Sequence, residues 1–150
     1  MQPMAQRSSA VSAAWPALPY DEWQDTCDTL HIWTQIVGKV KLALCPFLNE
    51  WWNVTLLLSG RGMTTGIIPY GDGAFEVAFD FVDHQLVIHA LGGGTKALPL
   101  VPQSVAAFYA QFMASLQALG ISVTINTLPS EVHNPIPCDV DEAHASYDPE

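Results

Sequence analysis

Acidic and imidazole side chains gather in the middle of the sequence, where they could carry out acid–base chemistry or bind a metal. Asp80, Asp83, His84 and His89 lie within ten positions of one another, and Glu76 precedes them. A carboxylate beside an imidazole can move protons or ligate a divalent cation. The simpler interpretation is that these residues cover the wet face of a half-buried sheet, with Asp83 and His84 forming its turn.

The expected pairing of two strands decides which of these side chains are neighbours. If Asp83 and His84 form a two-residue turn, Val82 pairs with Gln85 and Ala78 pairs with His89. His89 would then share the carboxylate face and lie diagonally across from both Asp80 and Glu76.

A second polar group lies close to the C-terminus and consists of His133, Cys138, Asp139, Asp141 and His144. Cysteine and histidine with nearby acids could bind zinc. The spacing fits no compact zinc motif, however, and acidic arms often contain such residues. These residues are therefore weak metal candidates, and no cofactor is expected.

Adjacent tryptophans, Trp51 and Trp52, are the third candidate site. The apolar run over residues 51–59 predicts a strand in the centre of the sheet. Neighbouring residues on a strand point to opposite faces, so at least one indole should meet the second sheet face, a partner or a ligand.

Two glycine-containing segments do not indicate a site. Residues 92–94 are three glycines, but they lead toward a strand, whereas a phosphate loop leads into a helix. Residues 59–62 (SGRG) lack the strand–serine–helix context of a nucleophile elbow and are expected to form a turn.

These candidates depend on the strand predicted over residues 75–82. Phe75, Val77, Phe79 and Phe81 alternate with polar or small residues, which is typical of a strand with one dry face. Further strands are expected at 63–68, 86–91, 95–100 and 121–127, in addition to 51–59. Apolar stripes predict helices over 20–44 and from Ser104, the expected N-cap, to Gly120. The predicted fold is α+β: an antiparallel meander of five to six strands with two amphipathic helices on one face.

The 150 residues divide into three expected regions: a disordered leader (1–14), an α+β domain (15–128) and a proline-rich acidic tail (129–150), taken as a linker or arm and not as core. The formal charge is −10, with 5 basic and 15 acidic residues. This balance disfavours binding to nucleic acids or to anionic membranes. No signal peptide or membrane span is visible, so a cytoplasmic location is expected, with Cys27 and Cys45 as reduced core residues.

The chain resembles a bacterial family of unknown function, DUF5996. The resemblance is carried by the segments WPALPYDEWQDTCDTLHIWTQIVGKVKLAL, FLNEWWNVTLLLSGRGMTTGIIPYG, FEVAFDFVDHQLVIH, LPLVPQSVAAFYAQFMASLQALGI and NPIPCDVDEAHASYDPE. It implies no activity and no site residues. It does imply that similar proteins continue past Glu150, so the chain is expected to represent only their N-terminal half.

Two functional hypotheses follow. Charged residues make up 13% of the chain, against about 25% in an average domain, so apolar surface is expected to remain uncovered. The favoured hypothesis is a non-catalytic binding or interaction module that pairs with a missing second half or forms a homo-oligomer. The alternative is a metal-dependent hydrolase that uses Asp80, His84 and His89, or the tail residues His133 and His144.

Overall fold

The computed structural model describes residues 17–149 and confirms the α+β class. The expected leader, residues 1–14, lies outside the described residues. The elements are α1 (Tyr20–Leu44), the 3-10 segment η1 (Asn49–Val54), β1 (Leu57–Ser59), β2 (Gly62–Thr64), β3 (Ile68–Tyr70), β4 (Gly73–Asp80), β5 (Gln85–Ala90), β6 (Thr95–Pro99) and α2 (Val105–Ala118).

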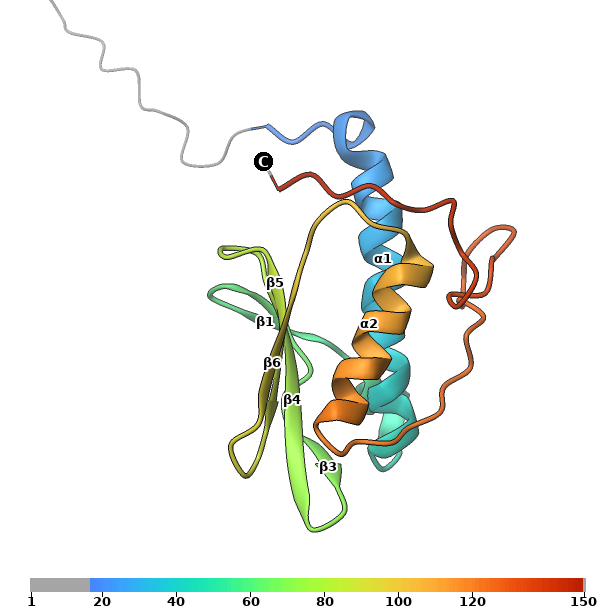
Figure 1. The fold of residues 1–150 in the computed structure, drawn as a ribbon. Helices are drawn as coiled ribbons and strands as arrows, with labels where there is room; N and C mark the ends of the chain where they lie inside the picture. The colour runs from blue at the N-terminus through green and yellow to red at the C-terminus, as the bar shows by residue number, and fades with distance from the viewer. Residues whose placement is uncertain (1–16, 150) are drawn as a thin grey trace, which may run out of the picture.

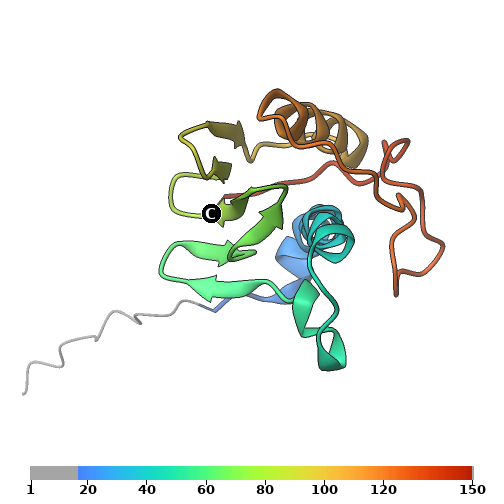
Figure 2. The same ribbon diagram turned by 90° about the horizontal axis from the view of Figure 1, so that it is seen from below.

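The strands form one antiparallel sheet in the order β1-β2-β4-β5-β6, and the short β3 pairs with one end of β4. Figures 1 and 2 show both helices on the same side of this sheet, as expected. The other face carries no helix or strand from residues 17–149. A sheet covered on one side keeps its second face for polar and small side chains.

Alternation along β4 builds the dry side of the sheet. Phe75, Val77 and Phe79 are buried beneath the helices, while the residues between them are only half-buried. The predicted alternation is therefore confirmed for these three residues, whereas Phe81 lies in the turn beyond the strand and is half-buried. Each such side chain stabilises the fold by about 1.5–3 kcal/mol relative to leaving it in water.

Aromatic stacking joins the helices to the sheet. Trp33 of α1 lies parallel to Phe108 of α2, with ring centroids 4.6 Å apart, and Phe108 also stacks on Phe79 of β4. The Ser104 hydroxyl accepts a hydrogen bond from the Ala107 N–H, which confirms the predicted N-cap of α2. Gly120 follows the helix with φ +77°, a left-handed conformation that suits glycine.

The strand predicted over residues 51–59 is wrong for most of its length. Only Leu57–Ser59 pair, and they form an exposed edge strand, not a central one. Trp51 and Trp52 belong to η1, in which Glu50 and Trp51 have left-handed backbone angles. The η1 segment is held in place by hydrogen bonds from the Leu48 N–H to Asn53 Oδ1 and from Lys41 Nζ to the Thr55 carbonyl.

The last predicted strand, 121–127, is also wrong. Its side chains alternate between buried or half-buried and exposed, but its backbone pairs with no strand. Figure 1 shows the chain leaving α2 and running along the outer side of the helix layer. Near its start, the Ser122 backbone is hydrogen-bonded to the Tyr70 hydroxyl of β3. Alternating burial alone does not reveal that the surface that buries these side chains is a pair of helices and not a sheet.

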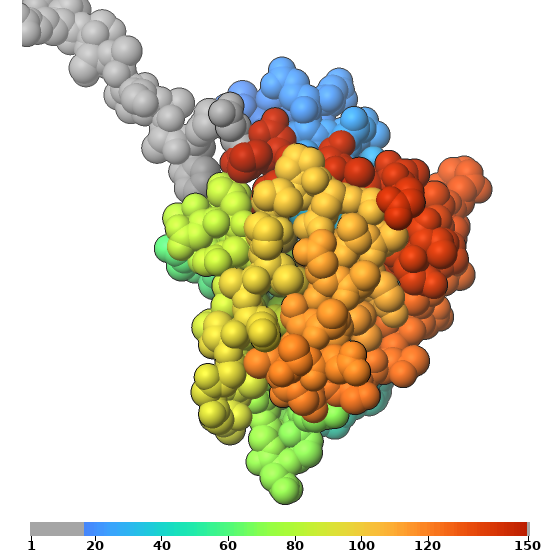
Figure 3. All heavy atoms as spheres, in the orientation of Figure 1, coloured from blue at the N-terminus to red at the C-terminus, as the bar shows by residue number. Residues whose placement is uncertain are grey.

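The C-terminal segment forms a third layer, so the expectation that it lies outside the core is wrong. Cys138 and Tyr147 are buried within the hydrophobic core, and Asp141 is fully buried. Figure 3 shows this segment packed against α2. The Thr29 and Thr26 hydroxyls of α1 accept hydrogen bonds from the backbone N–H groups of Ser146 and Asp148.

Candidate functional site

Asp80 lies at the end of β4 on the uncovered sheet face, where an arginine engages it. Arg61 Nε donates to Asp80 Oδ2 at 2.7 Å, and Arg61 Nη2 donates to Asp83 Oδ2 at 2.6 Å. The hydrogen bond from Arg61, followed by that from the Asp83 N–H, holds the pKa of Asp80 below its ordinary value. From the sequence, Arg61 is expected only as part of a turn. The feature of the sequence that could have indicated a role for Arg61 is that it is the one lysine or arginine between Lys41 and Lys96.

His89 shares this face, but the predicted register is wrong by two residues. His89 pairs with Glu76, and Ala78 pairs with Val87. The turn contains four residues because Asp80 Oδ1 accepts the backbone N–H groups of Val82 and Asp83. His89 is therefore directly across from Glu76 and is not a neighbour of Asp80.

The polar groups around His89 already have partners within the sheet. Glu76 accepts a hydrogen bond from the Thr64 hydroxyl, and His89 Nδ1 lies 3.2 Å from the Thr95 hydroxyl. A hollow of about 410 Å³ lies over this face, with Arg61, Asp80 and His89 among its lining residues. The arrangement is that of a hydrogen-bonded, solvated sheet face.

His84 points away from Asp80. Its backbone is left-handed, with φ +48°, and its Nδ1 lies 2.8 Å from the Tyr147 hydroxyl in the layer that covers the helices. Tyr147 in turn stacks on Trp33. The structure therefore divides the predicted Asp80, His84 and His89 cluster between the two sides of the sheet.

The tail candidates serve as structural contacts. The buried Asp141 carboxylate accepts hydrogen bonds from the His144 N–H and from His144 Nδ1, the latter at 2.8 Å. The carbonyls of these two residues accept the first N–H groups of α2, those of Ala106 and Val105. The segment thus satisfies donors that the helix itself leaves free.

Cys138 and His133 have different environments. Cys138 is fully buried, and this burial raises the pKa of its thiol to about 11, whereas His133 is exposed. Within residues 17–149, no group of three or more histidine, cysteine or acidic side chains is placed to hold a metal ion.

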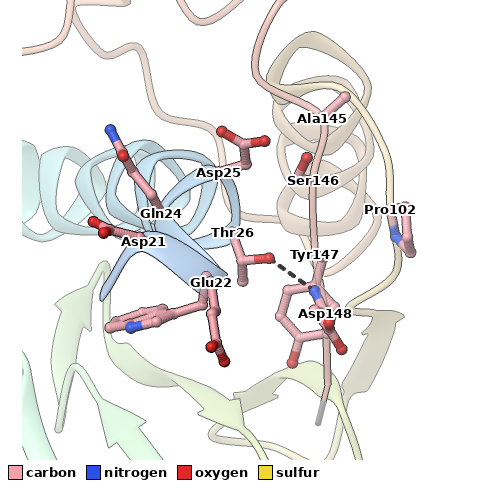
Figure 4. Close-up of a pocket in the computed structure, with 11 residues that line it drawn as sticks. Asp21, Glu22, Gln24, Asp25, Thr26, Pro102, Ala145, Ser146, Tyr147 and Asp148 are labelled. Atoms are coloured by element: carbon pink, nitrogen blue, oxygen red, sulfur yellow. Dashed lines mark hydrogen bonds between the residues drawn. The ribbon is translucent and has the colours of Figure 1, made fainter. Parts of the chain in front are cut away.

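A polar cleft of about 460 Å³ lies at the start of α1, where the C-terminal segment passes beside it (Figure 4). Asp21, Glu22 and Asp25 contribute carboxylates, and Tyr147 forms part of the wall. Acids in the first turn of a helix favour its dipole, which accounts for Asp21 and Glu22 without a ligand.

The two tryptophans are strongly exposed, at 59% for Trp51 and 71% for Trp52. The Phe47 ring packs edge-on against Trp51, with centroids 5.1 Å apart. Figure 2 places η1 and β1 along the same side of the molecule, opposite α2 and β6. We call the exposed apolar residues of this side the apolar edge, which consists of Phe47, Leu48, Trp51, Trp52, Leu57 and Leu58.

A shallow groove of about 380 Å³ adjoins the apolar edge. Leu42, Val54 and Leu56 provide its apolar wall, and Gly38 of α1 contributes to its lining. The Gly38 Cα is not in close contact, since an added Cβ would have only the Val54 carbonyl within 4 Å. The glycine thus leaves the groove open.

No helix within residues 17–149 is both long enough and apolar enough to cross a membrane.

Comparison with known proteins gives one result. No curated protein and no solved structure was found to match the chain. Residues 15–150 match the profile of a family of unknown function, DUF5996. Because this match covers most of the sequence, the chain belongs to the DUF5996 family.

Proposed function

We propose that this chain is a non-catalytic binding module that associates with another protein surface through its apolar edge. The observation that carries the proposal is the exposure of aromatic and leucine side chains along η1 and β1: Trp52 is 71% exposed and Leu58 is 87% exposed. Single exposed apolar residues are ordinary, but several of them on neighbouring segments along one side of a molecule are typical of interaction surfaces.

Composition and backbone geometry support the same proposal. Residues 42–58 contain one charged residue, Glu50, in a chain with 20 charged residues. Interface centres are depleted in charge and enriched in tryptophan and phenylalanine. The left-handed angles at Glu50 and Trp51 are costly for residues other than glycine, and such strain often accompanies a functional surface.

We also propose a cytoplasmic location. Cys27, Cys45 and Cys138 are all free thiols in the structure, and free thiols persist in a reducing compartment. Detection of the tagged chain in the periplasm of its host, with oxidised cysteines, would contradict this proposal.

Fluorescence of the apolar dye ANS tests the binding surface. We expect the dilute folded chain to bind ANS, and we expect the Trp52→Lys/Leu58→Lys double variant to lose most of that signal. Leu91→Lys is the matched control, because Leu91 is 77% exposed but lies outside the apolar edge. Equal ANS signals from all three proteins would remove the proposal.

The hydrolase hypothesis is the weaker proposal. Asp80 is bound to Arg61, and His84 faces Tyr147 on the other side of the sheet. Elemental analysis of untagged protein tests it directly. Stoichiometric zinc that is lost in Asp80→Ala and His89→Ala would restore it.

A further inference from the structure

The chemistry of the apolar edge also indicates what covers it. We propose, building on the proposed function, that the partner is a second copy of this chain, paired through the apolar edges of both copies across a twofold axis. Three observations support this: the distribution of charge, the exposed area of the edge, and the unpaired outer side of β1 among the described residues.

Charge distribution favours this edge for contact between identical molecules. Each copy carries a formal charge of −10, so most contacts between two copies bring acidic surfaces together. Two segments carry little charge: residues 42–58 contain Glu50 alone, and residues 97–130 contain no charged residue. Residues 97–130, however, expose only Val101 and Leu128 as large apolar side chains, whereas the apolar edge exposes six. Two copies can therefore approach through the apolar edge with little electrostatic repulsion and with apolar side chains to bury.

The exposed area is a large part of what a dimer interface requires. Phe47, Trp51 and Trp52 are 66%, 59% and 71% exposed. At about 150–250 Å² for a whole aromatic side chain, they offer roughly 300–500 Å² together. Leu48, Leu57 and Leu58 add to this area. A standard interface buries about 800 Å² on each partner, so the edge supplies most of what is needed.

Strand β1 provides the geometry for twofold pairing. It ends the strand order, so one side of its backbone has no strand partner among residues 17–149. Edge strands are commonly protected by charges, by proline or by being short. Leu57–Ser59 contain neither a charge nor a proline, and the three residues of β1 allow a short ladder with a second copy. Antiparallel pairing of β1 with its copy is symmetric, as a twofold interface requires, and would continue the sheet across both molecules.

Sedimentation velocity over a wide concentration range tests the proposal. We expect the 16.3 kDa chain to form a species of twice that mass as concentration rises. Trp52→Lys and Leu58→Lys should each raise the dissociation constant by roughly thirtyfold or more, the effect of losing a hot-spot residue. Leu91→Lys, on another surface, should leave dimerisation unchanged.

A cysteine at the edge tests the pairing itself. Opposed residues in an antiparallel pair have Cα atoms about 4.5–5.5 Å apart, a distance that a disulfide can span. Mild oxidation should therefore cross-link Leu58→Cys into a dimer, while the parent protein with its three native cysteines stays uncross-linked.

Two results would overturn the proposal. One is a chain that remains monomeric at every concentration, and the other is a dimer that both lysine substitutions leave intact. A monomer that retains edge-dependent ANS binding would remove the second copy as partner but keep the proposed binding surface. A chain that neither dimerises nor binds ANS through the apolar edge would remove both proposals.

Discussion

Tyr147 connects three parts of the molecule through one side chain. Its ring stacks on Trp33 of α1, with centroids 5.7 Å apart, and its hydroxyl lies 2.8 Å from His84 Nδ1 in the turn after β4. Burial raises the pKa of its phenol. The C-terminal segment is thus held by packing against a helix and by a polar contact with a sheet turn.

Substitution of Tyr147 should separate these two contributions. We expect Tyr147→Ala to lower the free energy of unfolding by about 3–5 kcal/mol, because it leaves a cavity beside Trp33. Tyr147→Phe keeps the ring and should cost only about 0.5–1.5 kcal/mol. Urea denaturation followed by tryptophan fluorescence measures both values. Equal costs for the two variants would show that the ring packing contributes little.

At the scale of single elements, the β1–β2 turn has a strict steric requirement. Gly62 has φ +150°, and a Cβ at this position would lie 2.1 Å from the Phe79 carbonyl oxygen of β4. An alanine would therefore force the strands apart. Gly60, in the same turn, has no atom within 4 Å of an added Cβ.

The two glycines provide a matched pair of variants. We expect Gly62→Ala to destabilise the chain by at least about 1–3 kcal/mol, the range for a strained backbone position. Gly60→Ala should change the free energy of unfolding by about 0.5 kcal/mol or less, as ordinary surface substitutions do. Urea unfolding curves of both variants decide the matter, and similar midpoints would contradict the steric argument.

Elements whose residues share one regular environment could be predicted from the sequence. The apolar stripe of α1 and the alternation of Phe75, Val77 and Phe79 reflect a core that contacts them along their whole length. The alternation of residues 121–127 reflects burial without identifying the covering surface, whereas the apolar content of residues 51–56 does not reflect burial, since Trp51 and Trp52 are exposed. Ile121 is buried beside helices and pairs with no strand.

The candidate sites were predictable to a smaller extent for a similar reason. Asp80 and His89 were placed on the correct sheet face, since a two-residue shift in register preserves the face. Their separation could not be foreseen, because it depends on hydrogen bonds from two backbone N–H groups to the Asp80 side chain. His84 and Tyr147 are 63 positions apart, and only the fold reveals their contact.

At the scale of the whole molecule, the sheet, the helix pair and the C-terminal segment form three layers, and Cys138 lies buried in the third. Its thiol is fully enclosed in the core, and this burial raises its pKa to about 11 from an ordinary value of 9.0. The folded chain therefore retains the thiol proton at a pH where the unfolded chain releases it. Stability should be complete below pH 9.0 and should fall as the pH rises toward about 11.

Unfolding at two pH values measures this effect of Cys138. Each unit of pKa difference corresponds to about 1.4 kcal/mol, so we expect the parent chain to lose about 1–3 kcal/mol between pH 8 and pH 11 from this group. Cys138→Ala should be less stable at pH 8 but should lose less on going to high pH. Cys27→Ala controls for the removal of a thiol elsewhere, and a reductant keeps all cysteines free. If Cys138→Ala and the parent chain lost the same stability at alkaline pH, the buried thiol would not couple the third layer to pH.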